Sequence, residues 1–258
     1  MQFPLLLHLG GLELHAHLVL EALAYFVGYR LYVRLRRSGG DPIPQIQRLT
    51  LVATAVGGAV VGSKALALLD DPAQTVQRAR ELWFLLGGKS VVGGLLGGLI
   101  AVEIAKRIMH VTVATGDLYV LPLIVGIAVG RIGCFLTGLD DQTHGVATAL
   151  PWGIDFGDGI SRHPTQLYEI VLMLVLGIVV MRRRRQPHVE GDLFKLFMIA
   201  YLAWRLCVEF IKPGVPLLSL TAIQWACVLG LLHYGRYARR VLAWSEPALP
   251  AAGARRHA

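Results

Sequence analysis

Apolar segments of about 20 residues, separated by short polar stretches, run through almost the whole chain. A helix that crosses a membrane needs about 20 consecutive, mostly apolar residues. Seven candidate spans lie near residues 14–33, 48–69, 83–105, 118–137, 166–181, 192–211 and 219–240. We therefore predict an all-α polytopic membrane protein with a single transmembrane domain over 1–245. Residues 1–12 are expected along the membrane interface, and 246–258 as a disordered cytoplasmic tail.

The amino-acid composition supports this class. Hydrophobic residues make up 55% of the 258 residues and charged residues only 16%, whereas a soluble domain has roughly 25% charged residues. A net charge of +8 would suggest a nucleic-acid partner in a soluble protein. Here the basic residues cluster beside the apolar segments, where membrane topology accounts for them. We expect no nucleic-acid partner.

The basic clusters also predict the orientation of the chain. They are Arg34, Arg36, Arg37, Arg48, Lys106, Arg107, Arg182 to Arg185, Arg236, Arg239 and Arg240. With seven spans, all of them fall on one side of the membrane, and cytoplasmic loops carry the excess of Lys and Arg. The N-terminus is therefore predicted outside and the C-terminus inside. In a bacterial inner membrane the loop 138–165 then faces the periplasm.

The three cysteines give no sign of a metal centre or a disulfide framework. Cys134, Cys207 and Cys227 all lie in apolar surroundings, and their spacing along the chain matches no metal-binding motif. The acidic residues of the loop 138–165 match no calcium-binding loop either. We expect no metal and no organic cofactor.

Arg131 stands near the end of a long apolar segment, between Gly130 and Gly133. A charged group at membrane depth is unfavourable and usually functional. A guanidinium can bind a phosphate through two parallel hydrogen bonds. The alternative is an arginine that only extends to the lipid headgroups. The flanking glycines favour close packing around the side chain, and thus a phosphate-binding role.

A second arginine lies inside the sixth apolar segment. Tyr201, Arg205 and Glu209 are spaced by four residues, so they share one face of a helix. The pair of charges could simply neutralise itself in lipid. The functional interpretation is a second phosphate-binding arginine held in place by Glu209.

The sequence from 162 to 169 combines several polar side chains at the start of the fifth apolar segment. His163 precedes a proline and is therefore expected in extended chain, while Gln166, Tyr168 and Glu169 occupy the outer end of the following helix. His163 could act as a general base near neutral pH. It could equally be an anchor that orders the outer loop.

Other charged residues are expected close to these groups. Asp140 and Asp141 follow the span that contains Arg131 and could activate a nucleophile, although loop acids are usually only solvated. Lys89 is expected at the outer end of the third span, facing the interior of the bundle.

Glycines repeat at a spacing of four in the third span. This spacing places Gly93 beside Gly97, and Gly94 beside Gly98, on one helix face. Small residues in such a pattern favour helix–helix packing. A face kept small for a lipid is the alternative.

Three of these motifs together resemble the prolipoprotein diacylglyceryl transferase family. They are Gly130-Arg-Ile-Gly133, the block Arg162-His-Pro-Thr-Gln-Leu-Tyr-Glu169, and Tyr201-x-x-x-Arg205-x-x-x-Glu209. The glycine-rich run at 87–97 is similar to the third-span motif of that family. The resemblance covers roughly 85–245, and His-Pro-x-Gln-Leu-Tyr-Glu is its most specific part.

The resemblance implies a seven-span enzyme that acts at the outer leaflet without a metal or cofactor. Such an enzyme transfers diacylglyceryl from phosphatidylglycerol to the lipobox cysteine of a secreted preprotein. For such a reaction Arg131 and Arg205 are suited to hold the leaving phosphate. His163, with Asp140 or Asp141 nearby, is our candidate proton acceptor, and His144 is the alternative. The residues expected to contact substrate are Arg162, Gln166, Tyr168, Glu169, Tyr201, Glu209, Lys89 and Cys134.

The chain departs from the pattern of that family at three positions. Val92 replaces a histidine, Cys134 replaces an asparagine, and Leu139 replaces an acid, with Asp140 and Asp141 adjacent. The chain is therefore predicted to be a divergent member. One alternative is a membrane protein that binds a lipid or peptide without catalysis, and another is a lipid transferase with a different acceptor. A transporter is disfavoured because no inverted internal repeat is present.

Overall fold

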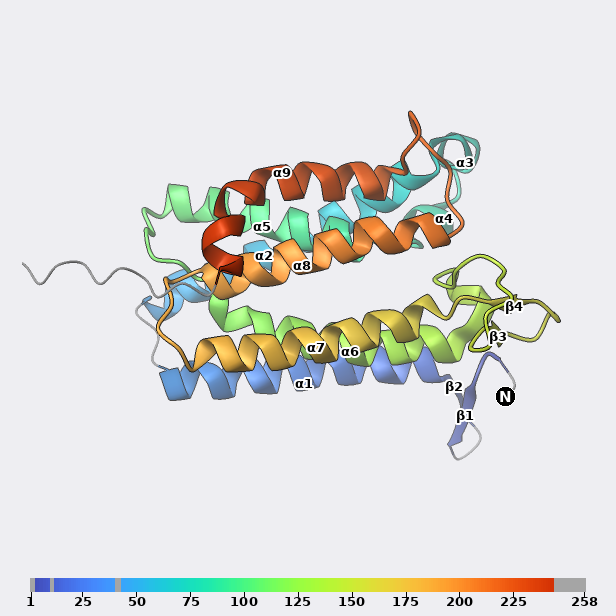
Figure 1. Cartoon of the computed structure of the whole chain (residues 1–258), viewed down its shortest axis with the longest axis horizontal. Coiled ribbons are helices and arrows are strands. Elements are labelled where there is room, and N and C mark those ends of the chain that lie inside the picture. Colours follow the sequence, from blue (N-terminus) through green and yellow to red (C-terminus); the bar gives the residue numbers. More distant parts are fainter. Residues whose placement is uncertain (1–2, 10–11, 40–42, 244–258) are drawn as a thin grey trace, which may run out of the picture.

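The structure is a computed structural model that describes residues 3–9, 12–39 and 43–243. Seven long helices make up most of this described part. They are α1 (Ala16–Gly39), α2 (Gln45–Asp70), α5 (Val91–Ile108), α6 (Asp117–Thr137), α7 (Thr165–Arg184), α8 (Asp192–Val208) and α9 (Ala222–Leu242). They run side by side along the long axis of the molecule (Figure 1). This architecture agrees with the predicted all-α membrane class.

Shorter elements lie at one end of the bundle. The short helices are α3 (Pro72–Gln77) and α4 (Leu82–Leu86), and the 3-10 helices are η1 (Gly138–Asp141) and η2 (Glu209–Ile211). Two small antiparallel hairpins pair β1 (Leu6–Leu9) with β2 (Leu12–His15), and β3 (Ile154–Asp155) with β4 (Ser161–Arg162). These elements close the end of the bundle at which α1 and α7 begin (Figure 1).

Three helical segments in the described residues are long and apolar enough to cross a membrane. They are Gln45–Asp70, Asp117–Asp141 and Thr165–Arg184. The remaining helices of the bundle do not meet this criterion. Helix α8 has only 17 residues, and others carry several charges near their ends, as with Arg36 and Arg37 in the last turn of α1. The chain is thus a helical membrane protein, while the count of seven spans stays a prediction.

One expected boundary is wrong, at the start of the third span. The third span was expected as one helix over 83–105, but the chain forms the separate helix α4 and resumes at Val91. The break falls at Gly87 and Gly88, where Gly88 has a φ of +35° that disfavours a continuous helix. The side chain of Ser90 then caps α5 by accepting a hydrogen bond from the Gly93 amide at 3.2 Å.

The structure adds detail to the N-terminal segment and to the end of the sixth span. Within the segment expected along the interface, described residues form the β1–β2 hairpin, and the amide of Leu5 donates to the carbonyl of Leu136 at 2.9 Å. The segment is therefore attached to the end of α6. The sixth span was expected over 192–211, and α8 followed directly by the tighter helix η2 covers these residues.

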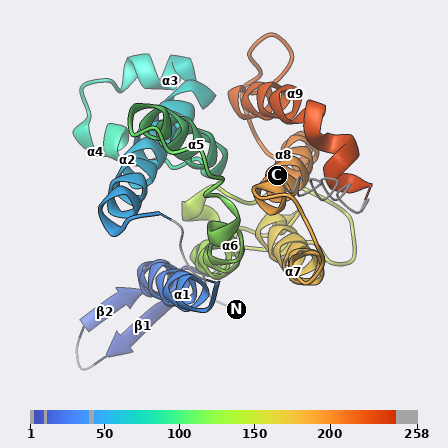
Figure 2. The same ribbon diagram turned by 90° about the vertical axis from the view of Figure 1, so that its left-hand side faces the viewer.

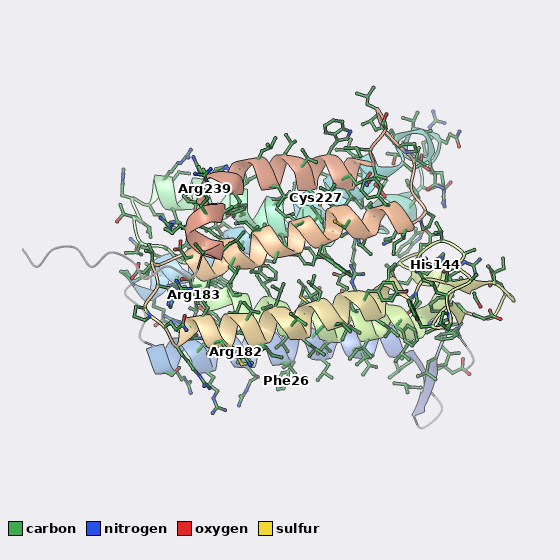
Figure 3. The ribbon with its side chains drawn as sticks, viewed as in Figure 1. Phe26, His144, Arg182, Arg183, Cys227 and Arg239 are labelled. Atoms are coloured by element: carbon green, nitrogen blue, oxygen red, sulfur yellow. The ribbon has the colours of Figure 1, made fainter. Side chains whose placement is uncertain are left out.

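The core lies between α6, α7, α8 and α9. Its largest wholly buried side chains include Met173, Phe197, Met198 and Tyr201. Seen along the bundle, α2 and α5 form a separate pair beside α9, while α1 packs against α6 (Figure 2). Large apolar side chains on the outer faces are exposed, among them Phe26, which points away from α1 (Figure 3). Such a surface suits contact with lipid.

The two ends of the bundle differ in chemistry. Arg182, Arg183 and Arg239 lie at one end, and His144 lies at the other, where the hairpins and short helices gather (Figure 3). The last turns of α5, α7 and α9 all contain basic residues. Arg78 and Arg80, which directly follow α3, are exceptions at the end that carries the hairpins.

Candidate active site

Arg131 is buried between α6, α7 and α8. Its Nε lies 2.9 Å from Oε2 of Glu169, and only 8% of the arginine and 2% of the glutamate are exposed. The other carboxylate oxygen of Glu169 accepts a hydrogen bond from the hydroxyl of Tyr201 at 2.8 Å. One residue from each of three helices therefore meets in a buried, charged contact. A buried charge is tolerated only when it is paired in this way.

A second buried ion pair lies on α8 and η2. Nη2 of Arg205 is 2.8 Å from Oε2 of Glu209, and the two residues are 6% and 4% exposed. The predicted spacing of four residues therefore does produce the pair. Glu169 is within electrostatic reach of Arg205 as well as Arg131, so the two ion pairs form one cluster. We call Arg131, Glu169, Tyr201, Arg205 and Glu209 the arginine cluster.

The predicted role of Tyr201 changes in one respect. The spacing placed Tyr201 on the same face as Arg205, but its hydroxyl donates to Glu169 of α7 and not to a partner on its own helix. The tyrosine therefore joins the two ion pairs across the helix interface. Such a contact between separate helices could not be predicted from the spacing within one helix.

Two further charged residues near the arginine cluster were not among the predicted site residues. Lys212 follows η2 directly, and burial together with the guanidinium groups of Arg205 and Arg131 lowers the pKa of Lys212 to about 7. Asp70, at the end of α2, interacts electrostatically with Arg205, Glu209 and Lys212. The only sequence signal for Lys212 was its place three residues after Glu209, and nothing local marked Asp70.

The outer loop brings His163 to a different partner. A ring nitrogen of His163 lies 3.2 Å from the hydroxyl of Tyr168, which also accepts a hydrogen bond from the indole of Trp152 at 2.8 Å. The amide of His163 donates to the carbonyl of Val146 at 3.1 Å. In the described chain no hydrogen bond or ion pair joins His163 to the arginine cluster. Its observed contacts are those of a loop anchor.

Arg162 and Gln166 hold the loop in the same manner. The guanidinium of Arg162 donates two hydrogen bonds to Asp158, at 2.6 and 2.7 Å, which raises the pKa of Arg162 and lowers that of Asp158. The buried amide of Gln166 donates to the hydroxyl of Thr143 at 3.0 Å. The hydroxyl of Thr143 donates in turn to Asp141 at 2.7 Å.

The remaining predicted residues divide into two groups. Cys134 lies next to the arginine cluster, because Nη1 of Arg131 donates to its sulfur at 3.8 Å. Lys89 pairs with Glu21 of α1 at 2.7 Å. Asp140 is exposed, and among the described residues its side chain makes no hydrogen bond or ion pair.

The geometry suits the binding of an anionic group. Each guanidinium has five N–H donors, and the ion pairs with Glu169 and Glu209 leave several of them free for another acceptor. Phosphate oxygens fit the planar fork of an arginine well. Two arginines and Lys212 near one another thus provide a site for a phosphate at the end of the bundle opposite Arg182 and Arg239.

Comparisons with known proteins agree with this chemistry. The family model described as prolipoprotein diacylglyceryl transferase matches residues 4–235. A phosphatidylglycerol–prolipoprotein diacylglyceryl transferase of Bordetella bronchiseptica is 31% identical over 245 residues, which are 87% of this chain and 90% of that protein. The enzyme of that name from Nitratidesulfovibrio vulgaris is 32% identical over 231 residues, covering 86% and 85%. The one from Glaesserella parasuis is 31% identical over 255 residues, covering 91% and 94%.

Proposed function

Because the chain belongs to the prolipoprotein diacylglyceryl transferase family, we propose that it transfers diacylglyceryl from phosphatidylglycerol to a lipobox cysteine of a preprotein. The cysteine thiolate attacks the glyceryl carbon that carries the phosphate. A carbon–sulfur bond forms, the carbon–oxygen bond breaks, and glycerol phosphate leaves with the bonding electrons. The observation that carries this proposal is the buried arginine cluster.

The arginines act on the leaving group. Negative charge grows on the phosphate as the carbon–oxygen bond breaks, and fixed positive charge in a site without bulk water stabilises it. Arg131 and Arg205 supply this charge, and Glu169 and Glu209 hold them in position. Because these partners are already in place before the substrate binds, little reorganisation is needed during the reaction.

The acceptor thiol must lose its proton before it can attack. Val92 lies in the hydrophobic core, with 1% of its surface exposed, and its side chain cannot take a proton. His163, with Asp140 or Asp141, is the proposed proton acceptor among the residues of the outer loop. Arg162 of β4, and Gln166 and Tyr168 in the first turn of α7, are proposed to contact the headgroup or the preprotein.

The proposed location is a bacterial inner membrane, crossed seven times, with the N-terminus outside. The basic ends of α5, α7 and α9 support a cytoplasmic position for the end that carries Arg182 and Arg239. The arginine cluster and the outer loop then face the periplasm. Membrane lipid surrounds the apolar faces of the helices.

A transfer assay tests the proposed function. The purified protein is incubated with labelled phosphatidylglycerol and a lipobox peptide, and mass spectrometry detects a diacylglyceryl thioether. Arg131→Ala is expected to lower the rate by about 10²–10³-fold, the usual effect of losing an electrostatic donor. Arg182→Ala, which removes an exposed arginine at the opposite end, is the matched control and is expected to retain activity. Full activity of Arg131→Ala would contradict the phosphate-binding role.

Because the buried Val92 cannot act as a base, a second function is a membrane protein that binds lipid without catalysis. The same assay separates the two. Phosphatidylglycerol that co-purifies with the protein, without any thioether in the presence of the peptide, would favour binding alone. Thioether formation that depends on Arg131 would establish the transferase.

A further inference from the structure

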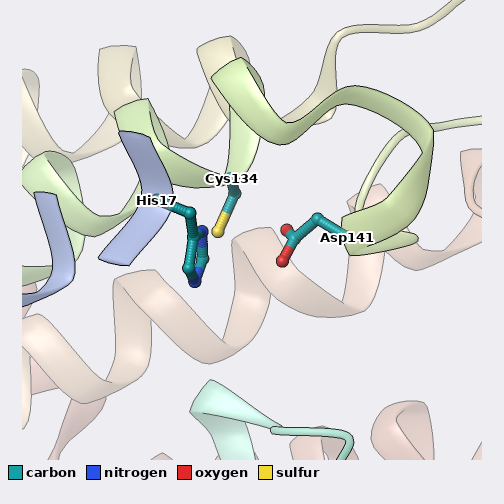
Figure 4. Close-up of side chains that lie close together, drawn as sticks. All are labelled: His17, Cys134 and Asp141. Atoms are coloured by element: carbon teal, nitrogen blue, oxygen red, sulfur yellow. The ribbon is translucent and has the colours of Figure 1, made fainter. Parts of the chain in front are cut away.

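Three side chains that are far apart in the sequence meet beside the arginine cluster. His17 comes from the start of α1, Cys134 from the last turn of α6, and Asp141 from the end of η1 (Figure 4). A nitrogen, a sulfur and an oxygen of these three residues all lie within 4.8 Å of one another. The expectation of no metal rested on spacing along the chain, and that spacing contains no sign of this cluster.

His17 is oriented as a metal ligand would be. Its Nδ1 is buried and has no hydrogen-bond partner among the described residues. Its other ring nitrogen, Nε2, lies 3.7 Å from Oε2 of Glu21, whose second oxygen accepts hydrogen bonds from Lys89 and Tyr25. A ligating histidine usually faces a carboxylate with the ring nitrogen that does not bind the metal. The buried, unpaired Nδ1 therefore points to a missing ligand.

Hydrogen bonds from outside the cluster also fix the orientation of Asp141. One of its oxygens, Oδ2, accepts the hydrogen bond of the Thr143 hydroxyl, and Thr143 is itself bonded by Gln166. Such outer contacts fix the orientation of a carboxylate ligand. The carboxylate also interacts with the thiol of Cys134, a contact that a metal ion between the two residues would replace.

Cys134 completes the donor set. Nη1 of Arg131 lies 3.8 Å from its sulfur, and Lys89 interacts with it electrostatically. Both cations offset part of the cost of burying a thiolate, which is the form that binds metals, and a bound metal ion would supply the rest. They also repel a metal ion, and this repulsion is opposed by the negative charges of Cys134, Asp141 and Glu21.

We propose that His17, Cys134 and Asp141 bind a divalent cation of the zinc class. Sulfur, imidazole and carboxylate are the donors that zinc prefers, and three protein ligands leave the fourth position of a tetrahedral site open. Zinc bond lengths imply donor separations of about 3.3–3.8 Å, so the three side chains need to move together by only about 1 Å. Small rotations of these three half-buried side chains would supply that movement.

The open position gives the site a role that rests on the proposed function. The lipobox thiol displaces a metal-bound hydroxide: its proton passes to the hydroxide, water leaves, and the thiolate stays on the metal. A thiol bound to such an ion is deprotonated outright. With the metal bound, the hydroxide would take the thiol proton in place of His163, and Asp141 would serve as a ligand. The metal would thus prepare the nucleophile next to Arg131, in a chain where Val92 cannot act as a base.

Cobalt binding tests the site without any need for catalysis. Purified full-length protein in detergent is loaded with Co²⁺, because a tetrahedral cobalt site absorbs visible light and a thiolate ligand adds a near-ultraviolet charge-transfer band. About one cobalt per chain with this band is expected. Cys134→Ser should abolish the band, whereas Cys227→Ser, a cysteine buried in the core at the α8–α9 interface, should retain it. A band that survives in Cys134→Ser, or no sulfur-ligated cobalt at all, would overturn the proposal.

A second variant guards against a folding effect in Cys134→Ser. Glu21→Gln leaves all three ligands in place and is expected to weaken cobalt binding about 10–100-fold, as loss of an outer-shell partner usually does. Unchanged affinity would show that the carboxylate does not support His17. Melting curves in detergent confirm that each variant is folded.

The role of the open position is tested by adding the acceptor in the absence of phosphatidylglycerol. A lipobox peptide with cysteine should intensify and shift the charge-transfer band, and the same peptide with serine should not. A band that the cysteine peptide leaves unchanged would overturn thiol activation by the metal. Because no lipid is present, failure of the transferase function would appear only in the separate transfer assay.

Discussion

Two helix contacts in this bundle are built in opposite ways. Helices α2 and α5 meet through glycines: a Cβ added to Gly62 would lie 2.7 Å from Cα of Gly97, so the backbones touch and no side chain fits between them. Helices α6, α7 and α8 instead enclose Arg131, Glu169 and Tyr201. The first contact excludes any ligand, while the second keeps charged donors inside the bundle.

The difference between the two contacts separates a role in stability from a role in catalysis. Small residues let membrane helices pack by close contact in the absence of a strong hydrophobic driving force. Buried charges contribute little to stability on their own, because desolvation offsets their attraction. The glycine contact is therefore expected to stabilise the fold, and the arginine cluster is expected to serve function. The predictions below test this division.

The largest effect is expected from Glu169→Leu, which leaves Arg131 buried without its carboxylate partner. Removal of one member of a buried ion pair usually destabilises a protein by about 3–5 kcal/mol. Thermal unfolding in detergent measures the loss, and the transfer assay should show almost no product.

The double variant Arg131→Met with Glu169→Leu is the control for this prediction. It removes both charges, so most of the stability should return while transfer stays absent. If the double variant is as unstable as the single one, the ion pair holds the helices together, and the proposed contrast with α2 and α5 is incorrect.

The second effect is expected in the glycine contact. Gly62→Ala places a methyl group against the backbone of α5, and overpacking of this kind usually destabilises by about 1–3 kcal/mol. Gly57→Ala in the same helix is the matched control, because a Cβ there meets nothing within 4 Å. Melting temperatures in detergent should fall for Gly62→Ala only. Equal melting temperatures would mean that the two helices can separate without loss of stability.

The packing contrast was partly predictable from the sequence. Glycines spaced by four residues in 91–108 indicated a helix–helix contact, and the structure confirms it with Gly93 and Gly97 against Gly62. The helix boundary at Val91 was missed because the apolar residues on both sides of Gly87-Gly-Lys-Ser90 give a long apolar window in spite of this interruption. Hydropathy detects apolar length, whereas a backbone turn at a positive φ is not part of that signal.

The candidate site was predictable only where its contacts are local. Arg205 and Glu209 are four residues apart on one helix, so their ion pair follows from helical geometry. The contacts of Arg131 with Glu169, and of Glu169 with Tyr201, join different helices and depend on how those helices pack. His17 likewise lies near Cys134 and Asp141 only because separate elements pack together, and no periodicity in the sequence indicates this contact.

A smaller effect is expected at Lys212. Its pKa of about 7 means that the ammonium loses its proton as pH rises through neutrality, so the KM for phosphatidylglycerol should increase over that range. Lys212→Ala should raise the KM at pH 6 by about tenfold, the size of a lost hydrogen bond to a charged group. Lys212→Arg, which stays charged, should flatten the pH profile. A wild-type KM that does not change with pH would contradict contact between Lys212 and the phosphate.

The same lowered pKa gives Lys212 a predictable effect on stability. The unfolded chain keeps the proton up to a pKa near 10.5, while the folded chain releases it near 7. Between these values the unfolded state binds more protons, so the free energy of unfolding should rise with pH. Lys212→Met should remove this part of the slope, which is measured by unfolding in detergent between pH 7 and 10.

The smallest effect is expected at the exposed pair in the outer loop. Asp158→Asn breaks the ion pair with Arg162, but an exposed ion pair contributes little to stability. The lowered pKa of Asp158 means that its contribution is present above its usual range and is lost as pH falls through the folded value. Melting temperature at neutral pH should therefore be unchanged, in contrast to Glu169→Leu.

The pair also tests what Arg162 contributes to substrate binding. If Arg162 contacts the phospholipid headgroup or the preprotein, Arg162→Ala should raise the KM for that substrate, while Asp158→Asn, which frees the guanidinium, should lower it or leave it unchanged. If both variants raise the KM equally, the pair serves to hold the loop from Ile154 to Arg162 in shape. Phosphate binding would then rest on the buried Arg131 and Arg205 together with Lys212.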